Sequence, residues 1–166
     1  MHIELRPVRQ EECATLDNLL EKYNYEFSQY DKIPFGEDGR YHYWPLDLYW
    51  TEQDRAAYFI MAEGKLAGFA LINAHPECDR PLDWAVAEFF VAYPYRRCGV
   101  GSEVMRQIFR RHKGVWHIKY HPANTASVAF WNGIARQHAA GGVEKLRGTE
   151  DYYDGTPSEV LVFQTV

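Results

Sequence analysis

The chain has 166 residues and a formal net charge of −5, and 46% of its residues are hydrophobic. This composition suits one folded domain, residues 1–166, with a sizeable core. The negative charge argues against general binding to nucleic acid or to anionic membranes. No apolar run approaches the ~18 residues that span a bilayer, so we expect no membrane partner.

Three cysteines, Cys13, Cys78 and Cys98, are scattered along the chain without the spacing of metal ligands. An odd, scattered set predicts reduced thiols and no metal site. The first residues alternate like a strand and lack the apolar segment of a secretory signal. We therefore expect a cytoplasmic protein.

The N-terminal part predicts a strand, a helix and a long loop. Residues 2–8 alternate apolar and polar side chains, and residues 9–29 carry apolar side chains at helical spacing. Residues 30–50 contain two prolines and two glycines, which predicts a loop. A short helix is expected near residues 47–54.

The rest of the chain alternates strands and helices. Residues 56–75 predict two strands joined at "EGK", and the apolar run at 84–93 predicts a central strand. The remaining predicted elements are a helix at 102–114, a strand at 115–121, a helix at 124–137, and strands at 142–148 and 158–166. This order predicts an α/β (α+β) fold with a mixed sheet.

The stretch "RRCGVG", residues 96–101, lies between the central strand and the following helix. Backbone N–H groups at a helix N-terminus, with glycines that admit a close ligand, form a natural anion site. The stretch matches neither the P-loop nor the dinucleotide fingerprint. The turn alone fits an ordinary strand-to-helix connection equally well.

The flanking sequence makes this turn more specific. Residues 96–101 match the pattern [RQ]xxGx[GA], "AEFFV" precedes them, and "NTASVAFW" follows one strand later. This combination resembles the GNAT superfamily of acetyl-CoA-dependent N-acetyltransferases, most specifically over residues 84–136 and least over 28–56. The resemblance implies a central mixed, mostly antiparallel sheet of about seven strands flanked by helices.

The resemblance also implies an acetyl-CoA site. Backbone amides of the turn would hold the pyrophosphate, and the end of the preceding strand would pair with pantetheine because its exposed amides need partners. Asn124 matches an asparagine that often contacts pantetheine, although it also fits a helix N-cap. The implied residues are Phe89, Phe90, Val91, Arg96, Arg97, Cys98, Gly99, Val100, Gly101, Ser102, Asn124, Phe130 and Trp131.

Trp131 stands where the family often has a tyrosine that protonates the departing thiolate. The indole N–H cannot act as an acid at neutral pH. Because a thiol with a pKa near ~8.5 is a fair leaving group, water would suffice. Trp131 would then wall the thioester pocket.

Glu88 is the candidate base because a carboxylate is unexpected inside an apolar strand. Burial raises the pKa of such a group and lets it accept a proton from the attacking amine. The alternative is a structural carboxylate. Simple alternation places Trp84, Val86, Glu88 and Phe90 on one face of the strand. His121 is a weaker candidate for relaying a proton, and its spacing from His117 on a strand does not suit a shared metal.

The loop at 30–50 is dense in aromatic and acidic residues. This mixture suits a cationic amine through charge and cation–π contacts. Tyr41, Tyr43 and Trp44 are the candidate substrate-binding residues. Ordinary core packing and a homodimer surface are the alternatives for the same cluster.

These observations predict an N-acetyltransferase that moves an acetyl group from acetyl-CoA to a primary amine of a small molecule or a peptide by direct attack. The absence of the tyrosine at position 131 keeps a second hypothesis open, which is a catalytically silent acyl-CoA-binding or sensor module on the same fold. A third is a nucleotide-binding interaction domain whose turn holds another phosphate.

Overall fold

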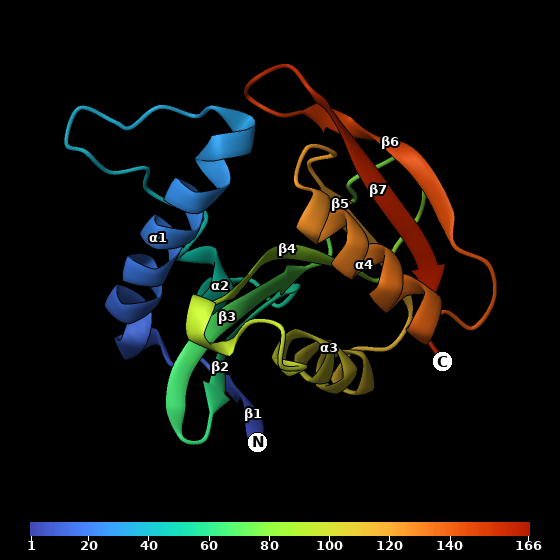
Figure 1. The fold of residues 1–166 in the computed structure, drawn as a ribbon, viewed down its shortest axis with the longest axis horizontal. Coiled ribbons are helices and arrows are strands. Elements are labelled where there is room, and N and C mark those ends of the chain that lie inside the picture. Colours follow the sequence, from blue (N-terminus) through green and yellow to red (C-terminus); the bar gives the residue numbers. More distant parts are fainter.

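A computed structural model describes residues 1–166 and places seven strands in one sheet, in the order β1-β2-β3-β4-β5-β7-β6 (Figure 1). All neighbouring strands are antiparallel except β4 and β5, so the predicted mixed, mostly antiparallel sheet is confirmed. The strands are β1 (Ile3–Pro7), β2 (Arg55–Ala62), β3 (Lys65–Asn73), β4 (Trp84–Val91), β5 (Val115–Tyr120), β6 (Glu144–Asp151) and β7 (Pro157–Gln164).

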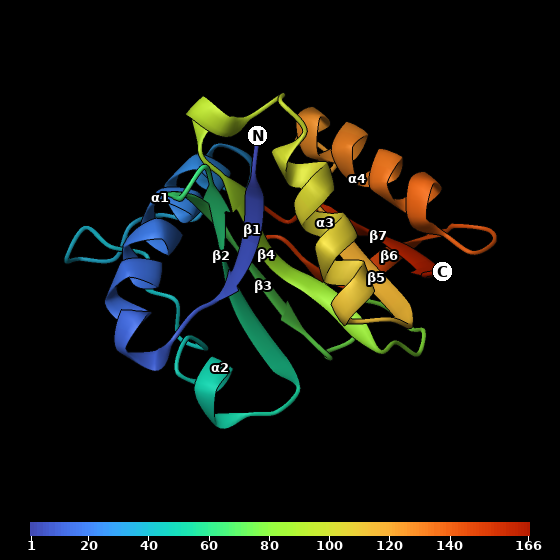
Figure 2. The same cartoon turned by 90° about the horizontal axis from the view of Figure 1, so that it is seen from below.

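Four α-helices cover the sheet, two on each face (Figure 2). They are α1 (Cys13–Asp31), α2 (Leu48–Thr51), α3 (Val100–Arg111) and α4 (Thr125–His138). The apolar side chains of α3 and α4 form one buried cluster with one face of the sheet, and those of α1 and α2 form a second cluster with the other face. None of these helices is long and apolar enough to cross a membrane.

The parallel pair β4–β5 is short. It pairs only Trp84–Val86 with Trp116–Ile118, although β4 continues to Val91 and β5 to Tyr120. The two strands therefore separate at their carboxyl ends, and β4 has no neighbour on that side over its last residues. Because the strands are parallel, the helices that follow them, α3 and α4, both begin at this edge of the sheet.

A β-bulge in β4 changes which side chains share a face. The register against β3 pairs Leu71 with Glu88 but Ile72 with Val86, so Ala87 is the extra residue. Trp84 and Val86 pack in the cluster of α3 and α4, whereas Ala87 and Phe90 pack in the cluster of α1 and α2. The prediction that Trp84, Val86, Glu88 and Phe90 share one face is therefore wrong.

Candidate active site

The turn before α3 has the geometry of an anion site. Gly99 has φ +84° and Arg97 has φ +58°. Left-handed residues in a turn let successive backbone N–H groups point toward one concave side. The N-terminus has no side-chain cap, and its first intrahelical hydrogen bond runs from Glu103 N to Gly99 O. The N–H groups of Val100, Gly101 and Ser102 have no intrahelical partner.

Gly101 is needed for a different reason. A Cβ atom at this position would lie 3.0 Å from the ring of Phe130. Phe130 stacks on Phe89 with ring centroids 5.9 Å apart, and Trp131 lies edge-on to Phe89 at 5.1 Å. Three aromatic side chains that the sequence assigns to the acetyl-CoA site thus gather beside the turn. Asn124 caps α4 by accepting a hydrogen bond from Ser127 N at 3.2 Å.

The side chain of Arg96 is directed toward α1 and away from the N–H groups at the start of α3. Its guanidinium group forms two hydrogen bonds to the carboxylate of Glu26 on α1, at 2.7 and 2.8 Å, and a third to the carbonyl oxygen of Val91. It also lies 4.2 Å from the ring centroid of Tyr93. Arg96 therefore connects the turn to α1, and three of its N–H donors are engaged by Glu26 and Val91.

The hydrogen bonds between β3 and β4 show which backbone groups of β4 face the gap, which is the space between the separated carboxyl ends of β4 and β5. Ala92 N donates to Ala67 O, and Phe90 pairs with Phe69 in the register. Since the direction of the backbone groups alternates along a strand, the N–H and C=O groups of Phe89 and Val91 point into the gap. Those of Phe90 point to β3, so its backbone does not serve a ligand in the gap as the sequence predicted.

Glu88 lies half-buried beside this gap, on the face covered by α1. Burial raises the pKa of its carboxyl group to about 7, and hydrogen bonding to Tyr23 and the positive charge of Lys119 offset part of that rise. A carboxyl group with this pKa is divided between its two protonation states at neutral pH. It is suited to accept a proton there.

Tyrosine side chains surround Glu88, and the sequence identified only one of them. Burial, with the charge of Glu88, raises the pKa values of Tyr23 on α1, Tyr43, Tyr49 on α2 and Tyr152 between β6 and β7. Tyr49 is 5% exposed, and its hydroxyl group has no hydrogen-bond partner. No pattern in the sequence marks Tyr152, because it lies in a polar loop.

The other two predicted substrate residues lie at the surface of the loop. Tyr41 packs on Phe35 with ring centroids 4.9 Å apart. Trp44 is 84% exposed and stacks on His42. Of the predicted wall, the structure brings only Tyr43 to Glu88.

His121 is buried, and both nitrogens of its ring have partners. Nδ1 accepts a hydrogen bond from Ala123 N at 3.1 Å, so the proton resides on Nε2, which lies 3.3 Å from the carboxylate of Asp154. Nδ1 of His117 accepts a separate hydrogen bond from Glu77 N. The two histidines thus have different hydrogen-bond partners.

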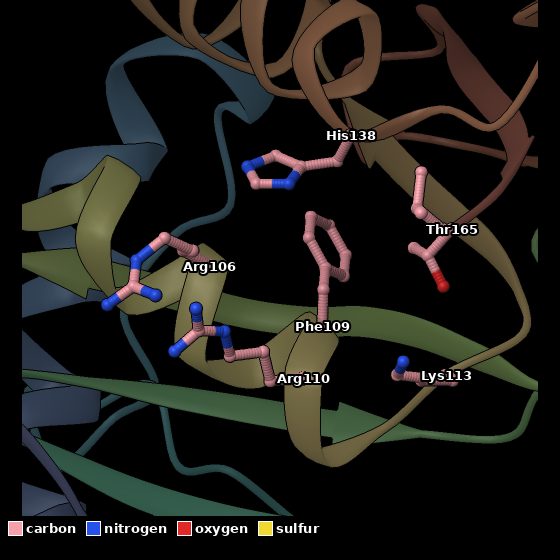
Figure 3. A pocket seen from close by; sticks show the side chains of 7 residues that line it. Arg106, Phe109, Arg110, Lys113, His138 and Thr165 are labelled. Atoms are coloured by element: carbon pink, nitrogen blue, oxygen red, sulfur yellow. The ribbon is translucent and has the colours of Figure 1, made fainter.

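A basic hollow of about 230 Å³ lies at the far end of α3 (Figure 3). Its lining residues are Arg106, Phe109, Arg110, Lys113, His138, Thr165 and Val166. Its lining on α3 begins at Arg106, a rise of about 9 Å from Val100, and extends beyond the end of the helix, so the hollow lies apart from the glycine turn. The cations at 110–113 therefore lie at the opposite end of α3 from the glycine turn.

The GNAT family model, described as "Acetyltransferase (GNAT) family", matches residues 16–133. The chain belongs to the GNAT acetyltransferase family. Both the predicted family and the predicted enzyme class, an acetyltransferase, are thereby confirmed. Comparison with curated protein sequences gave no match.

Solved GNAT acetyltransferases share the fold at low sequence identity. An acetyltransferase from Thermus thermophilus is 14% identical with a TM-score of 0.69, over 99% of this chain and 97% of that one. A histone acetyltransferase HPA2-related protein from Corynebacterium glutamicum is 16% identical with a TM-score of 0.69, over 100% and 98%. The aminoglycoside acetyltransferase AAC(6')-Ib, solved with coenzyme A, is 13% identical with a TM-score of 0.65, over 98% and 95%.

Proposed function

We propose that this GNAT acetyltransferase transfers the acetyl group of acetyl-CoA to a primary amine by direct attack. The observation that carries the proposal is the half-buried carboxyl group of Glu88, whose pKa is about 7, beside the gap where β4 leaves β5. One strand thus provides a base, and the turn that follows it provides free N–H groups for a phosphate.

The donor fits the residues of the gap. The backbone groups of Phe89 and the N–H group of Val91 would pair with the amide groups of pantetheine and with the thioester oxygen. Because Arg96 already occupies the Val91 carbonyl, the Val91 N–H is the free donor that would stabilise the negative charge developing on that oxygen. The turn at 97–102 would hold the pyrophosphate.

The acceptor would approach from the face of α1 and α2. The carboxyl groups of Glu88, Asp31 and Glu77 contribute negative charge there, which favours a cationic amine over an anionic substrate. Glu88 would take the proton that the amine must lose. The aromatic rings of Tyr23 and Tyr43 would flank a small-molecule or peptide amine.

A panel of primary amines with detection of released thiol tests this function. We expect thiol release with at least one acceptor, and a large decrease in turnover for Glu88→Gln. Unchanged turnover in Glu88→Gln would remove Glu88 as the base. If the wild-type protein binds acetyl-CoA but releases no thiol with any amine, the chain is instead a silent acyl-CoA-binding module.

A further inference from the structure

Tyr120 is a buried tyrosine at the point where β5 leaves β4. The last β5 residue paired with β4 is Ile118. Tyr120, two residues later, is the next side chain on the same face, since both belong to the cluster of α3 and α4. Phe89, across the gap, and Trp131 pack in that cluster too. Tyr120 therefore stands at the base of the gap, on the side of α4.

The hydroxyl group of Tyr120 has an unusual hydrogen-bonding state. Asn132 Nδ2 donates to its oxygen at 3.1 Å and also donates to the carbonyl oxygen of Val128 at 2.8 Å. The second bond fixes the orientation of the Asn132 amide, because only the NH₂ group can donate to a carbonyl. Asn132 therefore cannot accept the Tyr120 proton, and no other acceptor lies within hydrogen-bond distance.

A proton without an acceptor is costly in a residue that is only 2% exposed. Tyr58 shows the ordinary arrangement in the same cluster, since its hydroxyl group is paired with His112 Nε2 at 2.6 Å. A buried donor without an acceptor calls for an explanation, and a catalytic role is one. Asn132 thus holds the oxygen of the Tyr120 hydroxyl group in place, and the proton of that group has no acceptor in the protein.

We propose that Tyr120 is the residue that gives a proton to the sulfur of the leaving thiol, an inference that rests on the proposed function. The amine nitrogen bonds to the carbonyl carbon and gives its proton to Glu88. When the carbon–sulfur bond breaks, its electron pair goes to sulfur, and the Tyr120 proton passes to that sulfur. Glu88 then releases its proton to water and Tyr120 regains one from water, so both groups return to their starting states. Trp131 cannot do this, because an indole N–H is not an acid at neutral pH.

The kinetic test compares Tyr120→Phe with Tyr58→Phe, which removes from the same core a hydroxyl group that is paired with His112 at the end of α3. We expect kcat to fall about 100-fold in Tyr120→Phe, with unchanged affinity for acetyl-CoA, and to stay unchanged in Tyr58→Phe. With an aryl thioester donor, whose thiol leaves without protonation, the deficit of Tyr120→Phe should shrink.

A second readout does not require turnover. The thiolate absorbance of bound coenzyme A reports the pKa of its thiol. A hydroxyl donor stabilises the thiolate, so the bound thiol should titrate at a lower pH in the wild-type protein than in Tyr120→Phe. Asn132→Ala keeps the tyrosine but removes the group that orients it. Asn132→Ala should lower kcat and raise the pH at which the bound thiol titrates, as Tyr120→Phe does, but by smaller amounts.

Equal kcat values for Tyr120→Phe and the wild-type protein would overturn the inference, and so would an unchanged titration of the bound thiol. If the wild-type protein acetylates no amine but its bound thiol still titrates lower than in Tyr120→Phe, the proposed function fails while Tyr120 remains the donor to sulfur. A fall in kcat that is the same with the aryl thioester would assign Tyr120 a merely structural role.

Discussion

At the scale of single residues, the buried carboxyl group of Glu88 should lower the stability of the folded protein. Its pKa is about 7 in the folded protein against an ordinary value of 4.5. Between these values the folded state binds more protons than the unfolded state, so stability falls as the pH rises from about 4.5 to 7. The charged form of Glu88 therefore lowers the free energy of unfolding at neutral pH and above.

Glu88→Gln should therefore stabilise the fold. At pH 8 we expect its free energy of unfolding to exceed that of the wild-type protein by about 1–3 kcal/mol. The difference should vanish below about pH 4.5, where the carboxyl group is protonated in both states. Urea denaturation at several pH values measures this, and a wild-type protein that is the more stable at pH 8 would contradict it.

Glu12 provides a control of opposite sign. Hydrogen bonds from Arg6 and Arg9 lower its pKa to about 2, so its carboxylate stabilises the fold above pH 4.5 and loses that effect as the pH falls through 2. Glu12→Gln should consequently destabilise the protein at pH 7. Equal effects of the two substitutions would show that charge state does not govern either site.

The conformation of the turn before α3 depends on Gly99. At φ +84° a β-branched residue is strained, so Gly99→Val should displace the N–H groups at the start of α3 and abolish binding of acetyl-CoA. Cys98→Ala is the matched control in the same turn, because Cys98 is exposed and bonds only to Tyr95 O. Calorimetric titration with acetyl-CoA compares them, and tight binding to Gly99→Val would refute the assignment of the turn.

At the scale of elements, Arg96 and Glu26 connect the turn before α3 to α1, the helix that covers the face of Glu88. The pair is partly buried and bidentate. Glu26→Gln should lower the free energy of unfolding by about 1–3 kcal/mol and weaken acetyl-CoA binding, because Arg96 would release the Val91 carbonyl and the turn. Thermal unfolding and calorimetry measure both effects.

The exposed pair of Arg80 and Glu144 is the control for this prediction. It also has two hydrogen bonds, here from Nε and Nη2 of Arg80, but lies at the surface, where such pairs contribute about 1 kcal/mol or less. Arg80→Gln should leave acetyl-CoA binding unchanged. If Glu26→Gln behaves like Arg80→Gln in both measurements, Arg96 does not organise the turn.

The elements also show what sequence can predict. The glycine turn, the central strand and the helix at Asn124 were predictable because glycine conformation, apolar runs and caps depend on a few neighbouring residues. The bulge at Ala87 was not, because one extra residue in an apolar strand leaves no local signal. Tyr49 and Tyr152 reach Glu88 from segments distant in the sequence, and only the packing brings them together.

At the scale of the whole molecule, the one parallel strand pair organises the site. It places the N-termini of α3 and α4 at one edge of the sheet and leaves a gap there between the carboxyl ends of β4 and β5. Glu88 borders the gap on the side of α1, and Tyr120 borders it on the side of α4. A base for the amine and an acid for the thiol would thus act from opposite faces of one sheet.

The most direct test of this account is the pH dependence of kcat/KM for the best amine acceptor, in the wild-type protein and in Glu88→Gln. A base with a pKa of about 7 predicts that wild-type kcat/KM rises with pH through a limb near 7, separate from the limb of the amine at higher pH. Glu88→Gln should lose the limb near 7 and keep the other. The same limb near pH 7 in both proteins would contradict the role of Glu88.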